Sequence, residues 1–295
     1  MTLKPAPSTS QFVDIDHLKL HYLDFGDPQL PPGDDPRVKM LCLHGGAAQA
    51  HWFDFVVAPF LDDYRVLSLD LRGHGNSDWG PADQYNCTDF AKDIGGFIRK
   101  LGIGPVLLVG HSMGGMVSVV TAAQFPQQVA TLVVIDSMMR MSEERAAELR
   151  GIGTGKGKAF DCKDAYVAGF KIHPETGSAL PEVIRHMAAS SCRAFEDGLW
   201  RNKFDRNVYA RRHAIDGFEY WTQIGDAKTP ALVIAGGNSN RITQAVRAKL
   251  FAAHPGIAVT TVENAGHHVT LDNPAGYVDA LAAYLQSNRD ALLFT

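Results

Sequence analysis

Ser112 stands in the segment Gly110-His111-Ser112-Met113-Gly114, which has the pattern G-x-S-x-G. The apolar stretch Val106–Val109 before it predicts a strand, and a helix is expected over Met113–Phe125. A serine on a tight turn between a strand and a helix is exposed at the end of the strand, and flanking glycines permit the strained backbone. The start of the helix also favours negative charge beside the serine. The segment therefore predicts a serine nucleophile.

The rest of the chain alternates short β-type stretches with helical patterns, which is typical of a mostly parallel sheet. Further helices are expected over Phe90–Leu101, Thr243–Ala253 and Pro274–Gln286. We expect an α/β fold with a doubly wound, mostly parallel sheet of about eight strands. The predicted strands are Val13–Ile15, Leu18–Leu23, Val38–Leu43, Tyr64–Leu69, Val106–Val109, Leu132–Ile135, Ala231–Ala235 and Ala258–Val262.

One long stretch, residues 142–217, breaks this alternation because it has helical pieces without strand patterns. It predicts a helical cap inserted after the sixth strand, with residues 12–141 and 218–290 as the core and residues 1–11 as a flexible tail. Within the cap, the glycine-rich run over Gly151–Lys158 does not fit the phosphate-loop pattern G-x-x-x-x-G-K-[ST], so we expect a mobile loop there.

Four segments resemble the α/β-hydrolase fold family in their order and distances, over about residues 12–288. They are His44-Gly45-Gly46, Asp70-Leu71-Arg72-Gly73-His74-Gly75, Gly110–Gly114 and Gly266-His267. The resemblance implies hydrolysis through an acyl-enzyme on Ser112, with no metal or organic cofactor. A serine nucleophile argues against haloalkane or epoxide chemistry, for which this family uses an aspartate.

The general base is predicted to be His267. A serine hydroxyl is a weak nucleophile until a neighbouring base takes its proton, and imidazole suits this task. The family places its catalytic histidine in a Gly-His step after the last strand, and Gly266-His267 occupies that position. The adjacent His268 remains the alternative.

The acid of the triad is predicted to be Asp136. Most of the family carries this acid in the turn after the seventh strand, but Gly236–Arg241 contains no carboxylate. An asparagine there could not neutralise an imidazolium, and the same exchange in a serine protease costs about four orders of magnitude in turnover. A carboxylesterase-like branch resembles the pattern seen here, with the acid after the sixth strand and a serine, here Ser239, in the seventh-strand turn. The alternative for Asp136 is a helix cap, and we expect Asp272 to cap the helix at Pro274.

The resemblance also implies an oxyanion hole, because acyl transfer needs preorganised donors for the developing negative charge. The expected donors are the backbone N–H groups of Met113 and Gly46, with Ala47 as an alternative to Gly46. The candidate residues of the substrate pocket are His44, Trp52, His111 and His268.

Composition narrows the possible partners. The chain has 28 basic and 32 acidic side chains and a net charge of −4, so it lacks the basic footprint of a nucleic-acid-binding protein. No apolar run approaches the roughly 18 residues of a membrane span, and the first residues lack the apolar region of a signal peptide. Four scattered cysteines without a C-x-x-C pair fit reduced thiols in the cytoplasm. We expect a monomer or homodimer that acts on a small molecule.

Ester hydrolysis is the favoured activity because it makes the smallest demands on such a site. The same residues could also serve an amide or carbon–carbon bond hydrolase of a catabolic pathway. A ligand receptor with slow turnover is a further alternative.

Overall fold

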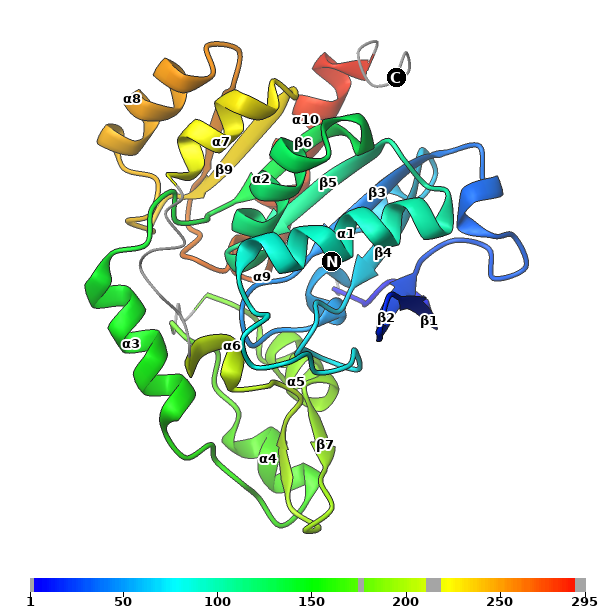
Figure 1. The fold of residues 1–295 in the computed structure, drawn as a ribbon, viewed down its shortest axis with the longest axis vertical. Helices are drawn as coiled ribbons and strands as arrows, with labels where there is room; N and C mark the ends of the chain where they lie inside the picture. Colours follow the sequence, from blue (N-terminus) through cyan, green and yellow to red (C-terminus); the bar gives the residue numbers. More distant parts are fainter. Residues whose placement is uncertain (1–2, 175–177, 211–218, 290–295) are drawn as a thin grey trace.

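The centre of the protein is an eight-stranded sheet with the order β1-β2-β4-β3-β5-β6-β9-β10 (Figure 1). Strand β2 is antiparallel to β1 and β4, and the other neighbouring strands are parallel. The structure is a computed structural model that describes residues 3–174, 178–210 and 219–289. It confirms the predicted fold class. The strands are β1 (Thr9–Ile15), β2 (Leu18–Asp24), β3 (Val38–Leu43), β4 (Tyr64–Leu69), β5 (Val106–His111), β6 (Val129–Ile135), β9 (Ala231–Gly236) and β10 (Ala258–Val262).

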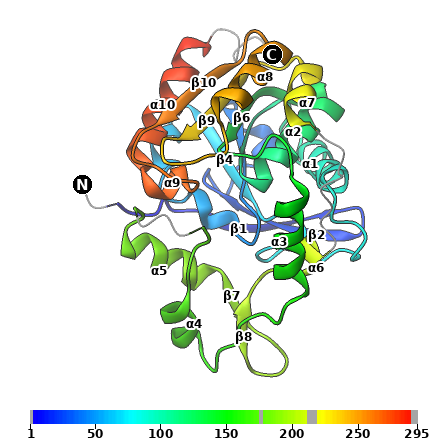
Figure 2. The ribbon, with the colours of Figure 1, turned by 90° about the vertical axis from the view of Figure 1, so that its left-hand side faces the viewer.

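Helices cover both faces of this sheet, as Figure 2 shows, with α1, α2 and α7 on one face and α10 on the other. Their ends follow local signals: the side chain of Asn86 caps the start of α1, and Gly102 ends that helix with a left-handed φ of 63°. The helices of the core are α1 (Cys87–Leu101), α2 (Met113–Gln124), α7 (Tyr220–Ala227), α8 (Gln244–Ala253), α9 (Val269–Asp272) and α10 (Pro274–Ser287).

The segment between β6 and α7 forms a separate group of elements at one end of the sheet, seen at the bottom of Figure 1. Its described residues form four helices and a small antiparallel pair of strands, and this strand pair was not predicted. Residues 175–177 and 211–217 of the predicted cap lie outside the described residues, and its division from the core stays a prediction. The elements are α3 (Glu143–Thr154), α4 (Lys163–Gly169), α5 (Pro181–Ser190), β7 (Cys192–Ala194), β8 (Trp200–Asn202) and α6 (Asn207–Ala210).

Two predictions about flexible segments need correction. Strand β1 begins at Thr9, and the buried Ala6 donates its N–H to the carbonyl of Asp54 over 2.8 Å, so this part of residues 1–11 is no loose tail. In the run over Gly151–Lys158, the first four residues belong to α3. A Cβ on Gly153 would lie 2.1 Å from the backbone nitrogen of Ala210, so this glycine permits close contact between α3 and α6.

Within the described ranges, no helix is both long enough and apolar enough to span a lipid bilayer.

Candidate active site

Ser112 lies on a sharp turn between the end of β5 and the start of α2. Its φ of 54° and ψ of −116° place it in a conformation that L-residues rarely adopt. The turn needs glycines on both sides. A Cβ on Gly110 would lie 2.3 Å from the carbonyl oxygen of Gly114, and a Cβ on Gly114 would lie 2.3 Å from that of Leu43. The strained turn therefore presents the serine hydroxyl at the carboxyl end of the sheet, as predicted from the motif.

The three residues predicted as a triad lie in one hydrogen-bonded series. The Nε2 atom of His267 lies 3.0 Å from the Oγ atom of Ser112. The Nδ1 atom of His267 lies 2.8 Å from the Oδ2 atom of Asp136. With Nδ1–H donating to the carboxylate, Nε2 carries the lone pair that can accept the serine proton.

Asp136 directly follows β6 and is fully buried. Its φ of 43° is also left-handed, which is a strained conformation at the point where the carboxylate turns toward His267. Besides His267, the carboxylate accepts hydrogen bonds from the N–H of Gly236 (3.1 Å) and the hydroxyl of Ser239 (2.7 Å). Asn240, in the turn where most of the family carries its acid, is exposed. The structure thus brings Asp136 and the predicted Ser239 to the histidine.

Asp272 has a different role from the predicted helix cap. Its Oδ2 atom accepts a hydrogen bond of 2.9 Å from the N–H of Gly266. The start of α10 is instead capped by Asn273, whose side chain accepts from the N–H of Gly276. Asp272 therefore holds the loop directly before His267, because α9 brings its carboxylate back to that loop.

A cation that the sequence analysis did not identify lies beside this series. The Nε atom of Arg241 is 3.6 Å from the Oδ2 atom of Asp136, and its side chain is only 15% exposed. Burial, and then the charge of Arg241, lower the pKa of His267. Burial raises the pKa of Asp136 to about 6, against the opposing effects of Ser239, Gly236 and Arg241. At neutral pH the pair therefore consists of a neutral imidazole and a carboxylate, which is the state a general base requires.

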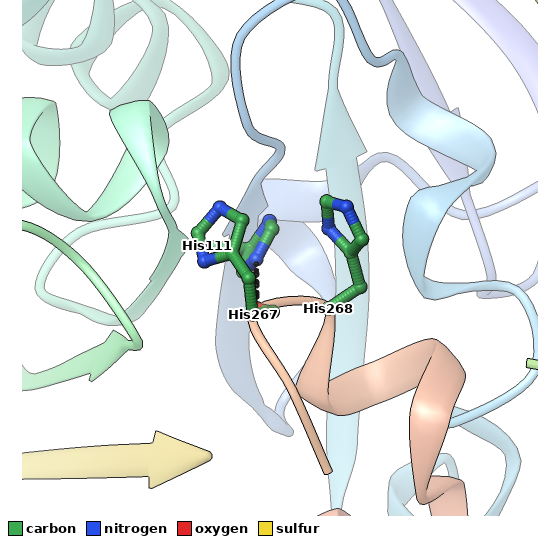
Figure 3. Close-up of side chains that lie close together, drawn as sticks. All are labelled: His111, His267 and His268. Carbon is green, nitrogen blue, oxygen red and sulfur yellow. Dashed lines mark hydrogen bonds between the residues drawn. The ribbon is translucent and has the colours of Figure 1, made fainter. Parts of the chain in front are cut away.

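Two further imidazoles stand beside His267, as Figure 3 shows. The Nε2 atom of His111 donates to the backbone carbonyl of His267 over 2.9 Å, which leaves Nδ1 of His111 without a partner among the described residues. His268 is buried, and neither of its ring nitrogens has a hydrogen-bond partner in the described part. Burial lowers the pKa of both residues, that of His268 to about 4. These rings supply unpaired polar atoms around the site rather than a second base beside Ser112.

The predicted oxyanion donors flank Ser112. Met113 is the first residue of α2, so its backbone N–H has no acceptor within the helix. Gly46 and Met113 line the same pocket as Ser112, whereas Ala47 does not line it in the described part of the chain. A Cβ on Gly46 would lie 2.0 Å from the hydroxyl oxygen of Tyr209, so this glycine also permits the close approach of α6.

The pocket around Ser112 has walls from both the core and the segment between β6 and α7. Of the predicted pocket residues, Trp52, His111 and His268 line it, and Trp52 stacks on His111 with ring centroids 5.0 Å apart. Arg145, Tyr209 and Arg241 also line the pocket, and the sequence analysis did not identify them as pocket residues. The lining residues are Gly45, Gly46, Ala48, Trp52, His111, Ser112, Met113, Met116, Met138, Met141, Arg145, Leu149, His173, Pro174, Tyr209, Arg241, His267 and His268.

His44 was predicted to line the pocket, and the structure corrects this. The ring is fully buried, with Nδ1 donating to the carbonyl of Gly45 (2.7 Å) and Nε2 accepting from the N–H of Leu71 (3.1 Å). Both nitrogens are therefore used within the protein. His44 joins two loops beneath the site and offers no polar atom to a ligand.

Two groups of described residues have ligand atoms close enough to hold a metal ion. One is His111, His267 and His268, and the other is His51, Asp54 and His186, which lies outside the pocket lining.

Comparison with known proteins agrees with this fold. The profile of the alpha/beta hydrolase fold matches residues 39–274, so the chain belongs to the α/β-hydrolase family and is a hydrolase.

Several relatives match nearly the whole chain. It is 28% identical over 281 residues to the 2-(acetamidomethylene)succinate hydrolase of Mesorhizobium japonicum, covering 94% of this chain and 95% of the relative. A crystal structure of E-2-(acetamidomethylene)succinate hydrolase superposes with a TM-score of 0.82 at 26% identity, covering 95% of this chain and all of the other. An esterase of Mycobacterium tuberculosis is 27% identical, with 86% of this chain and 84% of the relative covered.

Proposed function

We propose that this protein hydrolyses carboxylic ester bonds of a small molecule, with Ser112 as nucleophile, His267 as general base and Asp136 as the acid of the triad. The observation that carries the proposal is the continuous series from Ser112 Oγ to His267 Nε2 (3.0 Å) and from His267 Nδ1 to Asp136 Oδ2 (2.8 Å). The match to an esterase of the same family supports it.

In the first half of the proposed reaction, Ser112 Oγ attacks the carbonyl carbon of the ester while its proton moves to His267 Nε2. Asp136 stabilises the resulting imidazolium, and the N–H groups of Met113 and Gly46 donate to the oxyanion. The carbon–oxygen bond of the ester then breaks, His267 gives its proton to the leaving alcohol, and the acyl group stays on Ser112.

In the second half, a water molecule attacks the acyl carbon and gives a proton to His267. The bond between the acyl carbon and Ser112 Oγ breaks, and Oγ takes the proton back from His267. The free acid leaves, so the net reaction consumes one water molecule and restores the site.

The charges around the pocket favour a substrate that carries a carboxylate. Arg145 and Arg241 line the pocket. Both guanidinium groups lower the pKa of His267 after the larger effect of burial, so both act on the site as positive charges, and Arg145 also pairs with Glu148 over 2.7 Å. Planar guanidinium groups pair well with carboxylates, and they do so more strongly where water is excluded.

A second candidate is the hydrolysis of an amide that carries carboxylates. The relative from Mesorhizobium japonicum acts on 2-(acetamidomethylene)succinate, whose name denotes an acetamido group and two carboxylates. The two arginines at the pocket are the observation that favours this candidate, because they suit such a dianion.

The nucleophile is tested by replacing Ser112 with alanine. We expect the S112A variant to lose about four or more orders of magnitude in turnover of p-nitrophenyl acetate, because no acyl-enzyme can form. An unchanged circular dichroism spectrum controls for folding. Retained turnover would refute the assignment, and in the wild type a burst followed by very slow release would point to a receptor instead.

The substrate class is tested with a neutral ester, monoethyl succinate and the corresponding monoamide of succinate. We expect the anionic ester to have the higher kcat/KM, and R145Q to reduce that preference about tenfold through KM, since a charge-assisted hydrogen bond is lost. R140Q is the matched control, because Arg140 is 67% exposed and pairs with Glu219. Equal kcat/KM for neutral and anionic esters would contradict the proposed preference for a substrate with a carboxylate. Faster cleavage of the amide would favour the second candidate.

A further inference from the structure

A second group of histidines lies where the segment between β6 and α7 meets the core. His51 belongs to the short helix η2 (Ala50–Phe53), Asp54 follows it directly, and His186 lies on α5. His51 Nδ1 and His186 Nε2 each lie 2.7 Å from the same oxygen, Oδ2 of Asp54. Two imidazoles from different parts of the chain thus converge on one carboxylate oxygen.

The arrangement has the size of a metal site. One ligand atom from each of the three residues lies within 4.8 Å of the other two. An ion placed between three such atoms can therefore lie no more than 2.8 Å (4.8/√3) from each of them. Bonds from zinc to imidazole nitrogen are about 2.0–2.1 Å and to carboxylate oxygen about 2.0–2.2 Å, so shifts of less than about 1 Å would complete the contacts.

Access and charge also favour a cation here. The side chains of His51 and His186 are 30% and 27% exposed, whereas that of Asp54 is 3% exposed. The other carboxylate oxygen, Oδ1, is buried without a hydrogen-bond partner among the described residues. No lysine or arginine in the described part forms an ion pair with Asp54. A buried carboxylate that meets only imidazoles is poorly compensated, and a divalent cation would supply the missing charge.

The histidines of the catalytic pocket make a useful contrast. His111, His267 and His268 also satisfy the distance criterion, but they include no anionic ligand. The charge of Arg241 acts on all three rings and opposes a cation there. The charges therefore favour cation binding at His51, Asp54 and His186 over binding at the histidines of the catalytic pocket.

We propose that His51, Asp54 and His186 bind a divalent transition-metal ion of the zinc type, which ties α5 to the core. Two imidazoles and one carboxylate are ligands that suit zinc, and the exposed side of the group leaves a position for water. Trp52, the next residue after His51, lines the pocket and stacks on His111. The bound ion would thus hold η2, which carries His51 and the pocket residue Trp52, against α5.

The test is a titration of the full-length protein with ZnCl2 after removal of metal by a chelator, followed by calorimetry and thermal unfolding. We expect one zinc ion per chain and a rise in Tm of about 3–6 °C at saturation, because an ion that binds only the folded state stabilises it. The H186N variant should bind zinc at least tenfold more weakly and lose most of that rise. Its Tm without metal shows whether it still folds.

H268N is the matched control because it changes the other histidine group, and it should bind zinc like the wild type. Absence of zinc binding by the wild type would overturn the proposal, as would equal binding by H186N. Zinc binding that is lost in H268N and retained in H186N would also overturn it, by placing the ion at the catalytic pocket. All of these are binding measurements, so they stand apart from the outcome of the esterase tests.

Discussion

The core and the segment between β6 and α7 build the two sides of one pocket by different means. On the core side, Ser112 and Asp136 sit directly after β5 and β6, both with left-handed φ, and Asp136 is fully buried. On the other side, Arg145 reaches the pocket from α3 and Tyr209 from α6, and Arg145 keeps 35% of its side chain exposed. The reacting atoms are fixed by the sheet, whereas the opposite wall depends on α3 and α6, which pack at the end of the sheet.

This difference leads to an expectation about function. Backbone ladders hold the strand ends, so changes there should alter turnover without moving the pocket wall. Changes on α3 and α6 should act mainly on substrate binding, because these helices bring side chains to the pocket wall, whereas the hydrogen bonds that join Ser112, His267 and Asp136 come from the core. Three experiments, in order of expected effect, test whether the two sides act separately.

The largest effect is expected from D136N. An amide at this position cannot stabilise the imidazolium, and the equivalent change in a serine protease lowers kcat by about four orders of magnitude. N240A is the matched control, because Asn240 is exposed in the seventh-strand turn, and its kcat should stay within about twofold of the wild type. Steady-state kinetics on one ester decide the matter. Loss of turnover in N240A with retention in D136N would move the acid to that turn.

The same division explains what could be predicted from the sequence. The predicted bounds of Val38–Leu43, Tyr64–Leu69 and Ala258–Val262 agree with β3, β4 and β10. The strands of this sheet carry a clear local signal: β5 and β6 are buried, mostly apolar runs bounded by turns, and the half-buried edge strand β10 is rich in β-branched residues. Ser112, Asp136 and His267 each follow such a strand, and for this reason their meeting could be anticipated.

The segment between β6 and α7 gives weaker signals. Strands β7 and β8 have three residues each, too few for an alternating pattern. Gly153 looks like part of a mobile glycine-rich loop in the sequence, but it lies in α3. Its lack of a side chain permits the close approach of α6. Nothing local marks Arg145 or Tyr209 as pocket residues, since only the packing of their helices brings them there.

His44 and Arg241 show the same limit within the core. His44 stands in a motif beside the oxyanion loop, but its orientation depends on Leu71, 27 residues further along the chain. Arg241 could have been suspected, because it is the last residue of the turn in which the usual acid is missing. Its position 3.6 Å from the carboxylate of Asp136 still depends on how two strand ends meet.

A second experiment tests contact between the two sides at Gly46. In G46A the new Cβ would collide with the hydroxyl of Tyr209. Because either the oxyanion loop or α6 must then be displaced, kcat/KM should fall about tenfold. In the Y209A background this collision is absent, and G46A should then change kcat/KM by less than about twofold. A double-mutant cycle on one ester measures the coupling. Equal effects of G46A in both backgrounds would show that the two sides act independently.

The smallest expected effect concerns Arg241, which acts on the triad through charge. Its positive charge lowers the pKa of Asp136 and that of His267, so both pKa values should rise when it is removed. Turnover needs the carboxylate ionised and the imidazole neutral, and it should therefore fall as the pH drops through the pKa of Asp136, about 6. In R241Q we expect this acidic limb of kcat/KM to move upward by roughly 0.5–1 pH unit, measured with a neutral ester.

R140Q serves as the control for a general change in charge, because Arg140 is exposed and pairs with Glu219, and its acidic limb should stay in place. A neutral ester separates this effect from recognition of an anionic substrate, to which Arg241 would contribute through KM. An unmoved limb in R241Q with a raised KM for monoethyl succinate would assign Arg241 to binding alone. A shifted limb with unchanged KM would place it with the reacting series of the core, although it lines the pocket that the substrate enters.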